Sequence, residues 1–134
     1  MPEIKTYLVE DSPLIRDDLV ATLEELTPVH VVGSADNEGT ALQWLQQPGQ
    51  RVDLVIIDLF LRGGSGLGVL RALAAMPSPA RLVVLSNYAT PAMRQTCLAL
   101  GADGVFDKST EIDALIGYCG RIAGGQGATT PATG

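Results

Sequence analysis

Aromatic residues, cysteines and basic residues are scarce in this chain, and each shortage excludes a class of protein. Aromatics make up 4% of the residues against 46% hydrophobic residues in all, so any core must be aliphatic. The two cysteines, Cys97 and Cys119, are too few for a disulfide framework and lack metal-ligand spacing. With 9 basic and 15 acidic residues, the net charge of −6 argues against the basic surface that nucleic-acid binding needs.

The sequence also lacks the signals of export and of membrane attachment. No apolar run is long enough to span a bilayer, no helical stretch has a basic amphipathic face, and the first residues form no signal peptide. We therefore expect a cytoplasmic protein with neither a membrane nor a nucleic-acid partner. A length of 134 residues suits one domain with a substantial core.

Short apolar runs alternate with helical patterns five times along the chain. The runs that predict strands cover residues 7–9, 29–32, 54–57, 82–85 and 104–106, and Gly33-Ser34 is expected to close the second. Helical spacing of apolar residues covers 13–26, 40–46, 67–74, 91–100 and 112–122, with Ser12 as a predicted N-cap. Such βα repeats predict an α/β fold with a doubly wound, five-stranded parallel sheet.

The last residues differ in composition from the rest. From Gly124 the chain is almost entirely Gly, Thr, Ala and Pro, which offer too little apolar surface to order a segment. We expect one domain over residues 1–123 and a flexible tail over 124–134.

Polar residues follow four of the five predicted strands. The first strand leads into Glu10 and Asp11, the third into Asp58, the fourth ends at Ser86, and the fifth leads into Lys108. In open parallel sheets, ligands bind outside the carboxyl ends of the strands. Buried aliphatic strands have no structural reason to end in this way together, so the pattern predicts a functional site at this edge.

Three carboxylates in one pocket repel each other. A pair about 4 Å apart costs about 4 kcal/mol at an effective dielectric constant near 20, and a bound cation would relieve that repulsion. Oxygen ligands alone favour Mg²⁺, with Mn²⁺ as an alternative, over zinc. Lys108 adds one positive charge. A metal ion, an ammonium group and a nucleophilic carboxylate together fit phosphoryl transfer.

The ordered set of motifs resembles the receiver domain of two-component response regulators, over about residues 4–123. The matching segments are Val9-Glu10-Asp11, Ile57-Asp58-Leu59 followed by Gly66, Leu85-Ser86-Asn87, and Phe106-Asp107-Lys108. The resemblance implies a flavodoxin-like, CheY-like sheet with strand order 2-1-3-4-5. It also implies a signalling domain, not an enzyme in the ordinary sense, that catalyses its own phosphorylation and slow dephosphorylation.

The resemblance further implies roles for individual residues. Asp58 would accept a phosphoryl group from a sensor histidine kinase or phosphotransfer protein, and Ser86 and Lys108 would contact that group. The implied Mg²⁺ ligands are Glu10, Asp11, Asp58 and the backbone carbonyl of Phe60. Phosphorylation would then switch a face that binds a downstream protein or a second copy of the chain.

Three positions depart from the family pattern. Arg62 and Ser109 stand where the family often has proline, and Val105 stands where it often has an aromatic switch residue. Valine is stiff about χ1, and Phe106 should point to the opposite face of the sheet. We hypothesise that Ser86 and the loop 87–90 carry the switch without an aromatic residue.

Two other classes of function remain open from the sequence. The chain could be a binding module of the same fold that is never phosphorylated, although the complete acidic set argues against this. It could also be a flavin protein or a phosphohydrolase. The acidic first turn at Glu10-Asp11 would repel a flavin phosphate, and a phosphohydrolase needs a further acid or base beside Asp58.

Overall fold

The computed structural model describes residues 3–61, 63–76, 80–87 and 89–123, in which five strands alternate with five helices. The strands are β1 (Ile4–Val9), β2 (Val29–Ala35), β3 (Leu54–Ile57), β4 (Arg81–Ser86) and β5 (Gly104–Asp107). The helices are α1 (Pro13–Leu26), α2 (Glu38–Leu45), α3 (Gly66–Ala74), α4 (Pro91–Leu100) and α5 (Ile112–Ala123). All strand pairs are parallel, and their order β2-β1-β3-β4-β5 confirms the predicted topology.

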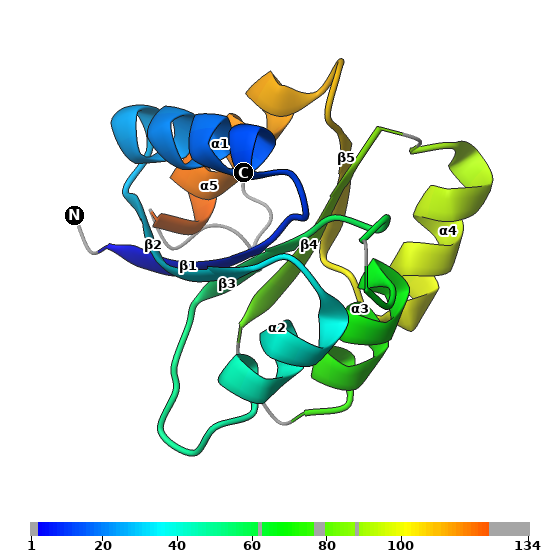
Figure 1. The fold of residues 1–134 in the computed structure, drawn as a ribbon. Coiled ribbons are helices and arrows are strands. Elements are labelled where there is room, and N and C mark those ends of the chain that lie inside the picture. The colour runs from blue at the N-terminus through cyan, green and yellow to red at the C-terminus, as the bar shows by residue number, and fades with distance from the viewer. Residues whose placement is uncertain (1–2, 62, 77–79, 88, 124–134) are drawn as a thin grey trace.

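The sheet lies between two layers of helices (Figure 1), and each layer packs on it through a hydrophobic core. Helices α1 and α5 cover one face, where Leu23 and Leu115 pack on β-strand residues. Helices α2, α3 and α4 cover the other, with Val69 and Cys97 in its core. Because β1, β3 and β4 lie between both layers, their side chains are buried almost throughout, as the continuous apolar runs predicted.

Local signals in the sequence set several helix ends. The Ser12 hydroxyl accepts a hydrogen bond from the Ile15 N–H at 3.3 Å, and Pro13 opens α1. Gly101 ends α4 with a φ of 116°, in the left-handed region that suits glycine. These two boundaries confirm the sequence prediction.

The predicted end of the second strand is wrong. β2 continues past Gly33 and Ser34 to Ala35. Glycine is needed at position 33 because the ring of Tyr7 packs against it: a Cβ there would lie 2.9 Å from Tyr7 Cε1. Trp44 of α2 stacks on the same Tyr7 ring, with 4.5 Å between ring centroids. Gly33 therefore makes room for an aromatic pair inside a strand.

The predicted tail, residues 124–134, lies outside the described residues. None of the helices within the described ranges combines the length and apolar character that crossing a bilayer requires.

Candidate functional site

The strand order brings the predicted polar residues to one edge of the sheet. Backbone hydrogen bonds fix the segments that leave the strands: the Asp58 N–H donates to the Val9 carbonyl, and the Lys108 N–H donates to the Ser86 carbonyl, each at 2.9 Å. Ser86 lies opposite Asp107 in the β4–β5 register. The residues that follow β1, β3, β4 and β5 therefore converge, as the parallel topology requires.

Three carboxylates meet at this edge. One oxygen from each of Glu10, Asp11 and Asp58 lies within 4.8 Å of the others. Glu10 is 2% exposed and Asp58 is 6% exposed, whereas Asp11 is half-buried. Such closely placed, poorly solvated negative charges are costly unless cations compensate them.

Lys108 supplies one such cation. Its Nζ donates to Glu10 Oε1 at 2.6 Å and to Asp58 Oδ2 at 3.0 Å, and its side chain is only 10% exposed. One ammonium group is thus shared by two buried carboxylates. Three negative charges and one positive charge leave the pocket acidic.

Burial and charge shift two protonation equilibria in the pocket. Burial raises the pKa of the Glu10 carboxyl, hydrogen bonds from Lys108 and Ser12 oppose this, and the Asp58 charge adds to it. Burial lowers the pKa of the Lys108 ammonium, but contacts with Glu10 and Asp58 outweigh burial and leave this pKa above its ordinary value. Lys108 therefore stays charged at neutral pH.

The two remaining predicted site residues lie on neighbouring segments. Ser86 is fully buried at the end of β4. Phe60 follows Asp58 by two residues, and its N–H donates to Asp58 Oδ1 at 3.3 Å while its side chain is 54% exposed. The turn at Phe60 thus folds over the Asp58 carboxylate.

The glycine-rich residues 63–66 lie in the turn beside Asp58. The Gly66 N–H donates to the Leu59 carbonyl at 3.0 Å, which closes the loop that leaves Asp58. At its far side, Glu38 accepts a hydrogen bond from the Ser65 N–H at 2.9 Å and fills the space above Gly64. Nothing in the sequence points to Glu38, because no spacing along the chain relates it to this loop.

Replacing Gly66 with alanine is expected to lower the free energy of unfolding by about 3 kcal/mol. An added Cβ would lie 2.0 Å from the Asp58 carbonyl oxygen and 2.6 Å from Leu59 Cα, and these backbone atoms cannot move aside. Gly120 on α5 is the matched control, since an added Cβ there meets nothing within 4 Å and alanine favours a helix by about 0.8 kcal/mol. Urea denaturation of both variants checks this, and equal stabilities would contradict it.

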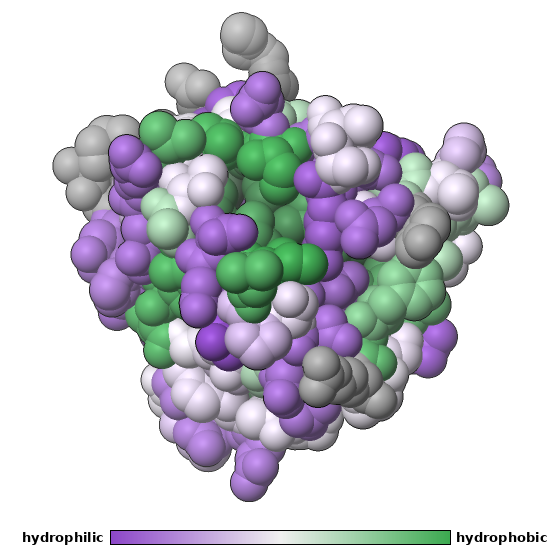
Figure 2. All heavy atoms as spheres, turned by 45° about the horizontal axis from the view of Figure 1, so that its top comes forward, coloured by the Kyte–Doolittle hydropathy of each residue, from purple (hydrophilic) through white to green (hydrophobic). Residues whose placement is uncertain are grey.

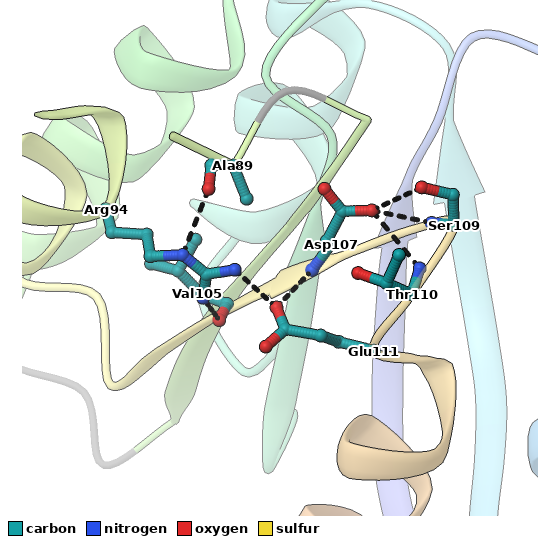
Figure 3. A network of polar contacts seen from close by, with 7 residues as sticks. All are labelled: Ala89, Arg94, Val105, Asp107, Ser109, Thr110 and Glu111. Carbon is teal, nitrogen blue, oxygen red and sulfur yellow. Dashed lines mark hydrogen bonds and ion pairs between the residues drawn. The ribbon is translucent and has the colours of Figure 1, made fainter. Parts of the chain in front are cut away.

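A second polar network, which the sequence analysis missed, lies beside Lys108 (Figure 3). Arg94 of α4 forms an ion pair with Glu111, and Glu111 accepts the Asp107 N–H at 2.9 Å. The one sequence feature that hints at this network is Glu111, an acidic residue just before the apolar pattern of α5. Val105 and Phe106 contribute to opposite hydrophobic layers, which confirms that they point to different faces.

Apolar side chains reach the surface near this edge. Leu14, in the first turn of α1, is 72% exposed, and Phe60 is 54% exposed. Figure 2 turns the top of the Figure 1 view forward and shows hydrophobic residues gathered in the middle of that face, among hydrophilic ones. Exposed apolar patches of this kind are typical of surfaces that contact other proteins.

Comparison with known families agrees with this fold and pocket. The family model described as the response regulator receiver domain matches residues 6–119, and the chain belongs to this family. It is thus a signalling domain of two-component phosphorelay systems with a CheY-like fold, not a classical enzyme. Its acidic pocket has the composition typical of the Mg²⁺ site in this family.

Individual relatives give the extent of the similarity. The chain is 32% identical over 126 residues to a nitrate/nitrite response regulator protein homolog of Haemophilus influenzae, covering 92% of this chain and 59% of that protein. It is 35% identical over 120 residues to a probable transcriptional regulatory protein of Picosynechococcus, covering 86% and 47%. The chain therefore spans about half the length of these relatives.

Among solved structures, the chain is similar to the signal receiver domain of the response regulator NarL from Mycobacterium tuberculosis. The two share 25% sequence identity with a TM-score of 0.81, and the match covers 94% of this chain and all of that domain. The five-stranded order and the two helical layers are those of the receiver fold.

Proposed function

We propose that residues 1–123 form a receiver domain that takes a phosphoryl group onto Asp58 in a Mg²⁺-dependent reaction. The donor is a phosphohistidine on a sensor histidine kinase or phosphotransfer protein. The observation that carries this proposal is the contact of a buried Asp58 carboxylate with Lys108, 3.0 Å away, beside Glu10 and Asp11. A nucleophile, a fixed cation and further acidic groups are what phosphoryl transfer to a carboxylate needs.

The donor set of the pocket fits Mg²⁺. All the candidate ligand atoms are oxygens, which are the ligands that hard divalent cations prefer, and one lysine cannot neutralise three carboxylates. The residues that would hold the ion are Glu10, Asp11, Asp58 and the backbone carbonyl of Phe60. When bound, the ion supplies positive charge that neutralises oxygens of the phosphoryl group during transfer.

The residues of the chain carry the remaining steps. An Asp58 carboxylate oxygen attacks the phosphorus atom, an O–P bond forms, and the P–N bond to the donor imidazole breaks, so that the electron pair stays on the nitrogen. Lys108, which contacts Asp58 Oδ2, pairs with a phosphoryl oxygen, and the Ser86 hydroxyl donates a hydrogen bond to another. Slow attack of water on the same phosphorus later returns the free carboxylate.

The phosphorylated domain then acts on another protein. Strand β4 ends at Ser86 and α4 begins at Pro91, so a shift of Ser86 toward the phosphoryl group would move the start of α4 and the surface formed by α4, β5 and α5. Within the connecting loop 87–90, residue 88 lies outside the described residues. This surface would bind a downstream protein or a second copy of the chain. A relative of which this chain covers 47% is named as a probable transcriptional regulatory protein, but with a charge of −6 this chain would not itself bind DNA.

The test is the intact mass of the protein after incubation with a small-molecule phosphodonor. We expect the wild-type chain to gain one phosphoryl group with Mg²⁺ and none with excess chelator, because the uncompensated pocket repels the anionic donor. The protein must be folded in both samples, which circular dichroism checks. If neither the small donor nor a phosphohistidine protein transfers a phosphoryl group, the chain is a constitutive binding module.

A further inference from the structure

The guanidinium of Arg94 connects three segments: the loop that follows β4, strand β5, and the residue that precedes α5 (Figure 3). Its Nε donates to the Ala89 carbonyl at 3.0 Å, in the loop that follows Ser86. Its Nη1 donates to the Val105 carbonyl of β5 at 2.9 Å, and its Nη2 donates to Glu111 Oε1 at the start of α5. One side chain thus ties the segment after β4 to the segments on both sides of Lys108.

The turn that carries Lys108 is closed by its own hydrogen bonds. Glu111 accepts the Asp107 N–H at 2.9 Å, and the Glu111 N–H donates to the Asp107 carbonyl at 2.9 Å. Asp107 Oδ1 accepts the Ser109 N–H at 2.8 Å and its hydroxyl at 2.6 Å, and also accepts from Thr110. Lys108 therefore sits inside a turn whose two ends are bonded to each other.

Both carboxylates of this turn are held in the ionised form that these bonds require. Hydrogen bonds from Ser109 lower the pKa of Asp107, and the hydrogen bond from Arg94 lowers the pKa of Glu111. Residue 109 is a serine, so no proline ring restricts the backbone after Lys108. The geometry of this turn therefore depends on its hydrogen bonds. Two of its partners come from outside it: the Ser86 carbonyl, which accepts the Lys108 N–H, and the Arg94 side chain, which donates to Glu111.

We propose that Arg94 and Glu111 are positioning residues that aim the Lys108 ammonium at Asp58 and Glu10, and that keep this turn in register with the loop after Ser86. The role in catalysis rests on the function proposed above. Neither residue touches the reacting atoms: Arg94 acts through Glu111, and Glu111 acts through the backbone of Asp107, next to Lys108.

Arg16 offers a matched comparison within the chain. Its side chain is 34% exposed, as is that of Arg94, but it forms an ion pair with the neighbouring Asp17, which is 70% exposed. An exposed pair of this kind contributes little to any structure. Arg94 instead donates to two backbone carbonyls and a carboxylate on three different segments.

Amine labelling tests the position of Lys108 without any phosphorylation. The chain has two lysines, and the exposed Lys5 serves as the internal reference. With a small acylating reagent, mass spectrometry should find Lys108 labelled about tenfold faster relative to Lys5 in Arg94→Met and Glu111→Ala than in wild type, since release from the carboxylates exposes its amine. Arg16→Met should match wild type. Equal labelling in all four proteins overturns the proposal.

Phosphorylation kinetics then test the consequence for catalysis. At saturating Mg²⁺, Arg94→Met and Glu111→Ala should each lose about tenfold in the maximal rate, because a misplaced charged group stabilises the transition state less. The Mg²⁺ concentration for half-maximal rate should stay within about twofold, because the proposed metal ligands are untouched. General loosening of the pocket would change both quantities.

The double variant separates one network from two independent effects. If both residues act through the same turn, Arg94→Met/Glu111→Ala should be no slower than either single variant, whereas independent losses would multiply to about a hundredfold. Arg94→Lys keeps the charge but not the planar set of donors, so its maximal phosphorylation rate should lie between those of wild type and Arg94→Met. This milder variant keeps the test possible if the other variants unfold. If the variants show faster Lys108 labelling but the wild-type chain takes up no phosphoryl group, only the proposed function is refuted. If all variants are phosphorylated at the wild-type rate, the catalytic role of Arg94 and Glu111 is refuted.

Discussion

Replacing Asp58 with asparagine is expected to abolish phosphoryl uptake completely. The amide has nearly the size of the carboxylate but is not a nucleophile toward phosphorus, so no O–P bond forms. Intact mass after incubation with a phosphodonor and Mg²⁺ measures this directly. Asp17→Asn is the control, because that carboxylate is 70% exposed and lies on α1.

The same substitution should leave the protein folded. The Asp58 charge raises the pKa of Glu10, so its removal relieves a repulsion between buried carboxylates while Lys108 keeps its contact with Glu10. Urea denaturation should therefore show a cooperative transition close to that of wild type. If the Asp58→Asn variant still gains a phosphoryl group, the acceptor is another carboxylate. Masses of proteolytic fragments would then show whether it is Asp11.

Replacing Lys108 with methionine is expected to lower the free energy of unfolding by about 3 kcal/mol at neutral pH, because it leaves Glu10 and Asp58 buried without their cation. The loss should shrink toward the ordinary glutamate pKa of about 4.3, where Glu10 can be protonated. Urea denaturation at these two pH values measures the difference. Lys5→Met is the control, since Lys5 is exposed.

The sign of this pH dependence follows from the Glu10 carboxyl. Without Lys108, a hydrogen bond that lowers its pKa is lost, while burial and the Asp58 charge still raise it. A raised pKa in the folded state means that folding favours the protonated form, so stability is kept at low pH and lost as the pH rises through the folded-state pKa. An equal loss at both pH values would contradict this account. Saturating Mg²⁺ should recover part of the loss, because an ion that binds only the folded state stabilises it.

The acidic pocket could be predicted because it depends on topology alone. Once five apolar runs form a parallel sheet, the residues that follow them must share one edge, so the proximity of Glu10, Asp58 and Lys108 follows from their places in the sequence. The sequence does not predict that Lys108 bonds to both Glu10 and Asp58, because this depends on how far the lysine side chain reaches.

The features that the sequence missed depend on contacts between distant segments. The Gly33-Ser34 pair predicts a turn when only neighbouring residues are considered. The glycine inside β2 is explained only by the stacked rings of Tyr7 and Trp44, which are distant in the sequence. Arg94 and Glu111 have the ordinary composition of helix surfaces, and no spacing pattern connects them. Their bond exists because α4, which carries Arg94, and α5, which Glu111 precedes, both lie beside β5.

The anchoring of Gly66 restricts how the segment between Asp58 and α3 can diverge. Its first residues are bonded to Gly66, and its last ones to Glu38, so an insertion or deletion would pull α3 away from β3 or strain the backbone around Asp58. Side chains that point outward, such as that of Phe60, face no such restriction. Engineering of partner preference at this rim should therefore succeed by exchanging residues at constant loop length, and loops of other lengths should not be transferable to this position.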